Sequence, residues 1–172
     1  MNIKIVVEDQ YLPQYANPTD ACLDLRAKIQ NNIKPLNLVG KMYRELKRLF
    51  GPVVGDTEDT IVIMPGTTRK VRTGVQVAIP EGHVMQMFVR SSTGIKKSLC
   101  LANGTGIIDA GYRDEVIMAL HNFGSEPVCI VNGDRLCQFL ILPYPKINLE
   151  QVEDNEDFRS GDRGGGIGST GK

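Results

Sequence analysis

The sequence contains no tryptophan and few other aromatic residues, with five Tyr and five Phe among 172 residues. Any core must therefore be mostly aliphatic. Basic and acidic residues are equal in number, 20 of each, so no overall charge attracts nucleic acid or a membrane surface. A highly charged ligand must be held by local groups instead. We expect neither a direct nucleic-acid partner nor a membrane partner.

Other absences narrow the possible functions and cellular locations further. The two histidines, His83 and His121, have no metal-binding partner at a useful spacing, so a structural or deaminase-type zinc site is not expected. No signal-peptide pattern follows Met1, and no apolar run approaches the ~18 residues of a membrane span. No Cys-x-x-Cys pair occurs, and we expect free, buried thiols in a reducing compartment at Cys22, Cys100, Cys129 and Cys137. The protein is expected to be soluble and cytoplasmic.

Many short segments have the pattern of β-strands. Glycine is frequent, at 18 residues, and with proline it separates these segments. Polar and apolar residues alternate or apolar residues run together at residues 3–7, 60–64, 70–79, 84–89, 116–120, 128–131 and 136–142. Such spacing predicts an all-β chain, a jelly-roll-like β-sandwich, in one domain over residues 1–150.

Two segments depart from this pattern. Residues 36–50, from Leu36 to Phe50, place apolar side chains on one helical face and basic ones on the other, which predicts one amphipathic helix in an inserted segment of about residues 31–59. The helix either packs over the sheet or binds a partner. Residues 151–172 are first acidic and then rich in glycine, and they predict a flexible C-terminal arm. This arm is either a frayed end or a flap that orders on a ligand.

Residues 90–97 follow a predicted strand and bring positive charge and hydroxyl groups into a short turn. Arg90, Ser91, Ser92 and Thr93 precede Gly94, and two lysines follow. Guanidinium, hydroxyl and backbone N–H groups together suit phosphate oxygens. The alternative is an ordinary exposed loop.

Residues 103–113 predict a site for a planar ligand. Their glycines let the backbone approach such a ligand closely. Ile107 and Ile108 place Asp109 at a strand end, where a carboxylate can activate a water molecule. Tyr112 can stack below a sugar. The alternatives are a turn-capping role for Asp109 and a core position for Tyr112.

Five ordered motifs carry a resemblance to a known family. They read DACLDLRA at 20–27, RSSTG at 90–94, GIIDAGYR at 106–113, GDRLCQ at 133–138 and RGGGIGSTG at 163–171. In these motifs the chain resembles the trimeric dUTP diphosphatases (dUTPases), including phage members with an inserted segment. The resemblance implies hydrolysis of dUTP to dUMP and pyrophosphate with Mg²⁺, by a homotrimer with shared active sites, in a bacterial or phage-infected cell.

The resemblance also implies a role for each matching residue. Asp24 would hold Mg²⁺ through water, Asp109 would activate the attacking water, and Ser91 would donate to the oxygen that bridges the α- and β-phosphorus. The phosphate chain would be held by Arg90, Ser92, Gly94 and Gln138. Uracil would be read by Asn103 and by the backbone at Gly106, Ile107 and Ile108, and deoxyribose would pack on Tyr112. The γ-phosphate and base would be covered by Arg163, Ile167, Gly168, Ser169 and Thr170.

Three positions differ from the usual family pattern. Cys22 and Asp114 replace glycines, and Ile167 replaces an aromatic residue that stacks on uracil. We expect a weaker clamp from the tail, because an aliphatic side chain recovers only the apolar part of stacking.

Two alternative functions are open at this point. A dCTP deaminase-like enzyme shares the Arg-Ser-Ser motif, but Ala119 stands where that family has its general acid and base glutamate. A phage regulatory protein would act by binding a partner through residues 36–50.

Overall fold

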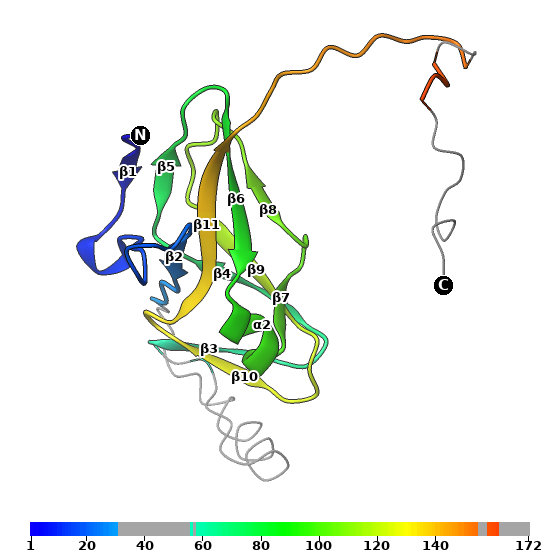
Figure 1. Cartoon of the computed structure of the whole chain (residues 1–172). Helices are drawn as coiled ribbons and strands as arrows, with labels where there is room; N and C mark the ends of the chain where they lie inside the picture. Colours follow the sequence, from blue (N-terminus) through cyan, green and yellow to red (C-terminus); the bar gives the residue numbers. More distant parts are fainter. Residues whose placement is uncertain (31–55, 57, 155–157, 162–172) are drawn as a thin grey trace.

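The computed structural model describes residues 1–30, 56, 58–154 and 158–161 (Figure 1). Two helical elements occur in this part of the chain, the 3-10 turn η1 (Asp9–Tyr11) and the short helix α2 (Ser91–Lys97). The remaining elements are the strands β1 (Lys4–Val6), β2 (Leu23–Arg26), β3 (Thr60–Ile63), β4 (Thr68–Arg72), β5 (Gln76–Ala78), β6 (His83–Val89), β7 (Leu99–Leu101), β8 (Gly106–Ile108), β9 (Ile117–Asn122), β10 (Val128–Val131) and β11 (Arg135–Pro143). The prediction of a jelly-roll-like β fold is confirmed.

The strands pair into a four-stranded sheet in the order β2-β11-β6-β8, a three-stranded sheet in the order β4-β9-β7, and the two pairs β1-β5 and β10-β3. All of these pairings are antiparallel. The long strands β6 and β11 lie side by side in the four-stranded sheet (Figure 1). One continuous cluster of buried side chains draws on every sheet, with Leu25, Ile63, Val77, Met85 and Met118 among its members.

Strand β9 illustrates how the alternating pattern produces this core. Met118, Leu120 and Asn122 are fully buried, and the residues between them are only partly buried. Successive side chains of a strand point to opposite faces, so one face of β9 packs into the core. Asn122 is polar, but its amide nitrogen donates to the carbonyls of Ile63 at 2.9 Å and Glu126 at 2.8 Å. The amide nitrogen of Asn122 therefore keeps its hydrogen bonds although the side chain is buried.

The structure corrects three details of the sequence prediction. Residues 70–79 do not form one strand, because Gly74, at φ +70°, turns the chain between β4, which pairs with β9, and β5, which pairs with β1. The segment after Arg90 is a helix, α2, and not a turn. Of the four free cysteines only Cys137 is buried, and the other three are partly exposed.

Two predicted features lie outside the described residues. The helix expected at residues 36–50 and nearly all of the inserted segment fall there, and so do residues 162–172. A protein partner at residues 36–50 therefore stays a prediction.

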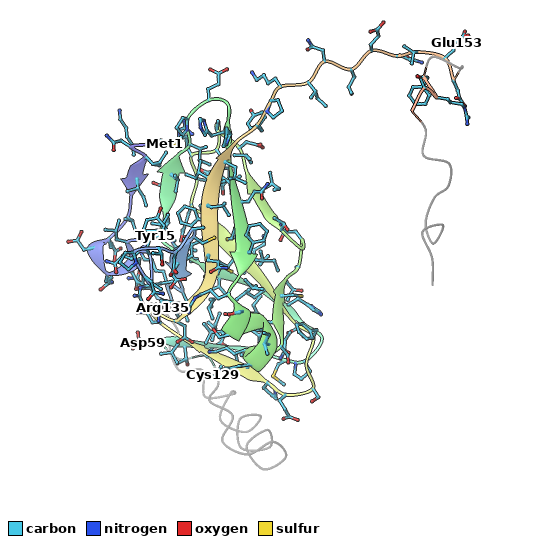
Figure 2. All side chains as sticks on the ribbon, viewed as in Figure 1. Met1, Tyr15, Asp59, Cys129, Arg135 and Glu153 are labelled. Atoms are coloured by element: carbon cyan, nitrogen blue, oxygen red, sulfur yellow. The ribbon has the colours of Figure 1, made fainter. Side chains whose placement is uncertain are left out.

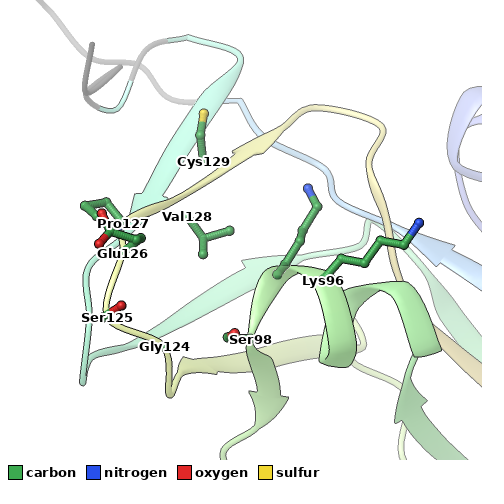
Figure 3. Close-up of a pocket in the computed structure, with 9 residues that line it drawn as sticks. Lys96, Ser98, Gly124, Ser125, Glu126, Pro127, Val128 and Cys129 are labelled. Carbon is green, nitrogen blue, oxygen red and sulfur yellow. The ribbon is translucent and has the colours of Figure 1, made fainter. Parts of the chain in front are cut away.

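The chain beyond β11 leaves the body of the molecule. Residues 144–154 have no regular secondary structure and are exposed, and after Lys146, which pairs with Glu81, the chain runs clear of the sheets (Figure 2). Ile147 and Leu149 are 74% and 91% exposed. Apolar side chains on such a segment are typical of a surface that another chain covers. In the described part of the chain, no helix has the length and apolar character needed to cross a membrane.

Candidate active site

The first half of the candidate site lies where β6 ends and α2 begins. Arg90 follows β6, and its backbone N–H donates to a carbonyl of β11 at 2.9 Å. The carbonyl of Arg90 accepts the N–H groups of Thr93 at 2.9 Å and Gly94 at 3.0 Å, which starts the helix. Ser91 and Ser92 form the exposed first turn of α2. The N–H groups and hydroxyls of a first helical turn suit the oxygens of a phosphate.

Asp24 joins this half-site from β2. It pairs with Gln138 of β11, so the two side chains share one face of the sheet. The Asp24 side chain is only 8% exposed, and its two oxygens bind different arginines. Oδ1 lies 2.8 Å from Nε of Arg90, and Oδ2 lies 3.1 Å from Nη1 of Arg135. Asp24 therefore fixes the orientation of the guanidinium group of Arg90.

The magnesium ion that the resemblance implies can be tested against these residues. In the described part of the chain, no group of three His, Cys, Asp or Glu side chains could hold a metal ion. The Asp24 carboxylate already accepts hydrogen bonds from two arginines. Mg²⁺ usually keeps several waters and binds one or two carboxylates together with substrate phosphates. The residues fit an ion that arrives on a triphosphate and meets Asp24 through water, and they do not fit an ion held by protein groups alone.

The second half of the candidate site lies along β8. Gly106 packs so closely on β6 that a Cβ atom in its place would lie 2.8 Å from Cε of Met87. Asn103 is exposed in the turn before β8, and Ile107 is exposed within the strand. Ile108 is partly buried. A strand edge of this kind presents backbone N–H and C=O groups to a planar ligand.

Asp109 and Tyr112 follow β8 in an exposed loop. Asp109 comes directly after the strand, as the sequence predicts, and its carbonyl accepts the N–H of Tyr112 at 3.1 Å. The Tyr112 ring is 38% exposed, and its hydroxyl donates to the carbonyl of Glu115 at 2.9 Å. Tyr112 is therefore a fixed surface residue and not part of the core.

The two half-sites do not meet within one chain. Ile108 pairs with Met85 near the start of β6, whereas Arg90 follows the last residue of that strand. A strand advances about 3.3 Å per residue, so roughly 20 Å of β6 separates Asp109 from Arg90. A single chain therefore does not place the carboxylate of Asp109 beside the groups at α2.

The last predicted site residues and the unusual positions can now be placed. Arg163, Ile167, Gly168, Ser169 and Thr170 lie outside the described residues. Of the unusual positions in the described part, Asp114 is exposed, and Cys22 is partly exposed with its thiol pKa raised by burial and by the charges of Asp20 and Asp24. Ser98 is the one non-glycine residue with positive φ among those described, so Cys22 does not strain the backbone.

Sequence reasoning did not single out two residues that the structure places at the site. Arg135 belongs to the motif at 133–138, but its pairing with Asp24 spans 111 positions of the chain and has no local pattern. Glu115 follows the motif at 106–113, and its carboxylate reaches across to residues 72–74. Only the strand pairing brings these partners together.

Comparison with known proteins decides the family. The dUTPase family model matches residues 56–171. The chain belongs to the dUTPase family. The deoxyuridine 5'-triphosphate nucleotidohydrolase of Clostridium tetani is 33% identical over 172 residues, covering 100% of this chain and 97% of its own length. That of Escherichia phage T5 is 39% identical over 128 residues, covering 74% of this chain and 83% of its own.

The fold of this dUTPase also matches solved structures. A mutant dUTPase from phage phi11 of S. aureus has a TM-score of 0.64 and 22% identity, covering 90% of this chain and 98% of its own. That relative coordinates a structural Mg(II) ion. Its likeness to this chain extends to the arrangement of the strands.

Proposed function

We propose that this dUTPase hydrolyses dUTP to dUMP and pyrophosphate, using one water molecule that attacks the α-phosphorus. The observation that carries the proposal is Asp109, which stands exposed at the end of β8 within the motif at residues 106–113. As the water attacks, its proton passes to the Asp109 carboxylate, and the bond between the α-phosphorus and the bridging oxygen breaks. Pyrophosphate leaves with that oxygen.

The groups around α2 support the leaving pyrophosphate. Negative charge grows on the bridging oxygen as the bond breaks, and a donor aimed at that oxygen stabilises the transition state more than the ground state. Ser91 supplies this donor. Arg90 and Ser92 hold the neighbouring phosphate oxygens, together with Gln138. The backbone N–H of Gly94 is already bonded to the carbonyl of Arg90, so it is not one of these donors. Asp24 would face the water shell of a Mg²⁺ ion carried by the triphosphate, and such an ion would neutralise part of the triphosphate charge.

Recognition of the nucleoside belongs to the β8 side. Asn103 and the backbone of Gly106, Ile107 and Ile108 read the edge of uracil, and Tyr112 supports the deoxyribose ring. The close packing of Gly106 on Met87 fixes this strand, so a larger base edge has no room to be accommodated by a shift.

We propose further that the active enzyme is a homotrimer whose sites are shared between chains. The distance of roughly 20 Å between Asp109 and Arg90 supports this arrangement, because a triphosphate nucleotide must touch both at once. The exposed apolar side chains of Ile147 and Leu149 on the arm support it as well, since contact with a neighbouring chain would cover them. The motif at residues 163–171 would then reach a site from a third chain and close over it.

The first experiment is pyrophosphate release with Mg²⁺ from dUTP, dTTP, UTP and dCTP, by the purified chain and by Asp109→Asn. Release confined to dUTP, and lost in the variant, supports the proposal. A well-folded chain that releases no pyrophosphate from dUTP overturns it. Release of ammonia from dCTP, measured separately, would instead favour the deaminase alternative.

A second experiment tests the sharing of sites. Ser91→Ala and Asp109→Asn chains are unfolded, mixed in equal amounts and refolded together. If each site takes Ser91 from one chain and Asp109 from another, random assortment restores both groups in about a quarter of the sites. Recovery of activity near that fraction supports sharing, and no recovery above the separate variants argues for sites within single chains.

A further inference from the structure

The loop that carries Asp109 and Tyr112 is exposed, so something must hold its shape. Inside the loop, Tyr112 bonds to Asp109 through its N–H and to Glu115 through its hydroxyl. Arg113 folds back and donates to the carbonyls of Ala110 at 2.5 Å and Tyr112 at 2.7 Å. These contacts tie the loop to itself, but they do not tie it to the body of the protein.

The Glu115 side chain makes that connection. Its Oε1 accepts the backbone N–H groups of Thr73 at 3.1 Å and Gly74 at 2.6 Å. Its Oε2 lies 2.9 Å from Nε and 2.7 Å from Nη2 of Arg72. The Glu115 side chain is 19% exposed, and its carboxylate has four donors, two from Arg72 at the end of β4 and two from the turn that follows. Charge-assisted hydrogen bonds of this kind are stronger than neutral ones.

The turn that the Glu115 carboxylate binds is itself rigid. Gly74 has φ +70°, and a Cβ atom there would lie 2.6 Å from Cδ of Lys28. The buried hydroxyl of Thr73 donates to the carbonyl of Val116 at 2.7 Å, and the N–H of Val116 donates to Val75 at 2.8 Å. Residues 73–75 and 115–116 therefore form one firm junction, and the carbonyl that receives the Tyr112 hydroxyl belongs to it.

We propose that Glu115 is a positioning residue that sets the enzyme's choice of deoxyribose over ribose through Tyr112. Its carboxylate fixes its own backbone carbonyl, that carbonyl fixes the Tyr112 hydroxyl, and the ring then stands at one height below the sugar. This inference rests on the proposed function, because it assigns the sugar to Tyr112. If the Tyr112 ring shifts by a fraction of an ångström, it leaves room for a 2′-hydroxyl, and the rate of dUTP hydrolysis falls.

The test compares kcat/KM for dUTP and UTP in the full-length chain and in Glu115→Gln. Glutamine keeps the size of the side chain but loses the charge that pairs with Arg72. We expect the ratio of dUTP to UTP to fall about tenfold. Arg72→Gln breaks the same contact from the other side and should have the same effect, which covers the case in which one variant does not fold. Glu126→Gln is the matched control, because Glu126 is exposed and lies on the β9–β10 turn.

A double-mutant cycle separates positioning from general destabilisation. Tyr112→Phe removes the hydroxyl through which Glu115 is proposed to act. The effect of Glu115→Gln on selectivity should then largely disappear in the Tyr112→Phe background. An equal effect in both backgrounds, or an unchanged ratio in Glu115→Gln, overturns the proposal.

Amide hydrogen exchange makes the result independent of the assigned reaction. The N–H of Tyr112 is bonded in the intact loop, and Glu115→Gln should speed its exchange while the exchange of β9 stays the same. Unchanged exchange at Tyr112 overturns the anchoring role even in an active enzyme. A wild-type chain with no dUTP hydrolysis but a loosened loop in the variant rejects the proposed function and leaves the anchor in place.

Discussion

Replacing Asp24 by asparagine should weaken the fold even without metal. The Asp24 side chain is 8% exposed, and its partners Arg90 and Arg135 are 24% and 41% exposed. Removing one member of a fully buried ion pair costs about 3–5 kcal/mol, because the remaining charge has no partner. Both arginines can regain water here, so we expect a smaller loss, of about 2 kcal/mol in the free energy of unfolding.

Urea unfolding in the presence of EDTA measures this loss. Protein concentration must be equal for all variants, because the stability of an oligomer depends on it. Glu126→Gln, a surface change of the same kind, should stay within about 0.5 kcal/mol of the wild-type chain.

Two outcomes would refute the reasoning. If Asp24→Asn is as stable as the wild-type chain in EDTA, the two ion pairs do not stabilise the fold. If the variant is less stable only when Mg²⁺ is present, Asp24 acts through the metal ion and not by orienting Arg90. The expected result is equal destabilisation with and without Mg²⁺, together with a raised KM for dUTP.

Three further predictions concern single side chains. Gly106→Ala should lower the free energy of unfolding by about 1–2 kcal/mol, because the new methyl group meets Met87. In the Met87→Ala background, which is itself less stable, a urea titration should show a smaller cost of Gly106→Ala. Partial burial alone raises the pKa of the Glu115 carboxyl, but the hydrogen bonds and charge of Arg72 and the backbone donors outweigh it and lower that pKa below the usual 4.5. The stability that Glu115→Gln loses at pH 7 should therefore shrink as the pH falls below about 4.5, and a constant difference down to pH 3 would contradict this. Burial raises the pKa of the Cys137 thiol to about 12, so iodoacetamide at pH 8 should modify it in urea and not in the native chain, as mass spectrometry of its peptide would show.

Most strands were predictable because their signal is local, but β2 and β7 lie outside the segments that the sequence predicts. At β3 the burial pattern follows directly from the residue types, and both β3 and β10 lie where the sequence places them. The helix α2 was missed because Ser, Ser, Thr and Gly favour turns over helices. Only Thr93 is buried in α2, so little hydrophobic periodicity marks it.

The site was predictable in its residue types and not in its geometry. Motif matching names Asp24, Arg90 and Asp109 but says nothing about the distance between them. The register of β6 against β8 gives that distance, and the ion pair of Arg135 with Asp24 joins residues 111 positions apart. Pairing between strands that are distant along the chain has no signature in a short window of sequence.

The separation of the half-sites along β6 also has a consequence for cells that make two versions of this chain. Consider equal amounts of an intact chain and one damaged in both half-sites. If every site were built by one chain, about a half of the sites would work, but sites shared by two chains leave only about a quarter. A damaged copy would thus inactivate half-sites that its intact partner contributes, and it would behave as a dominant inhibitor.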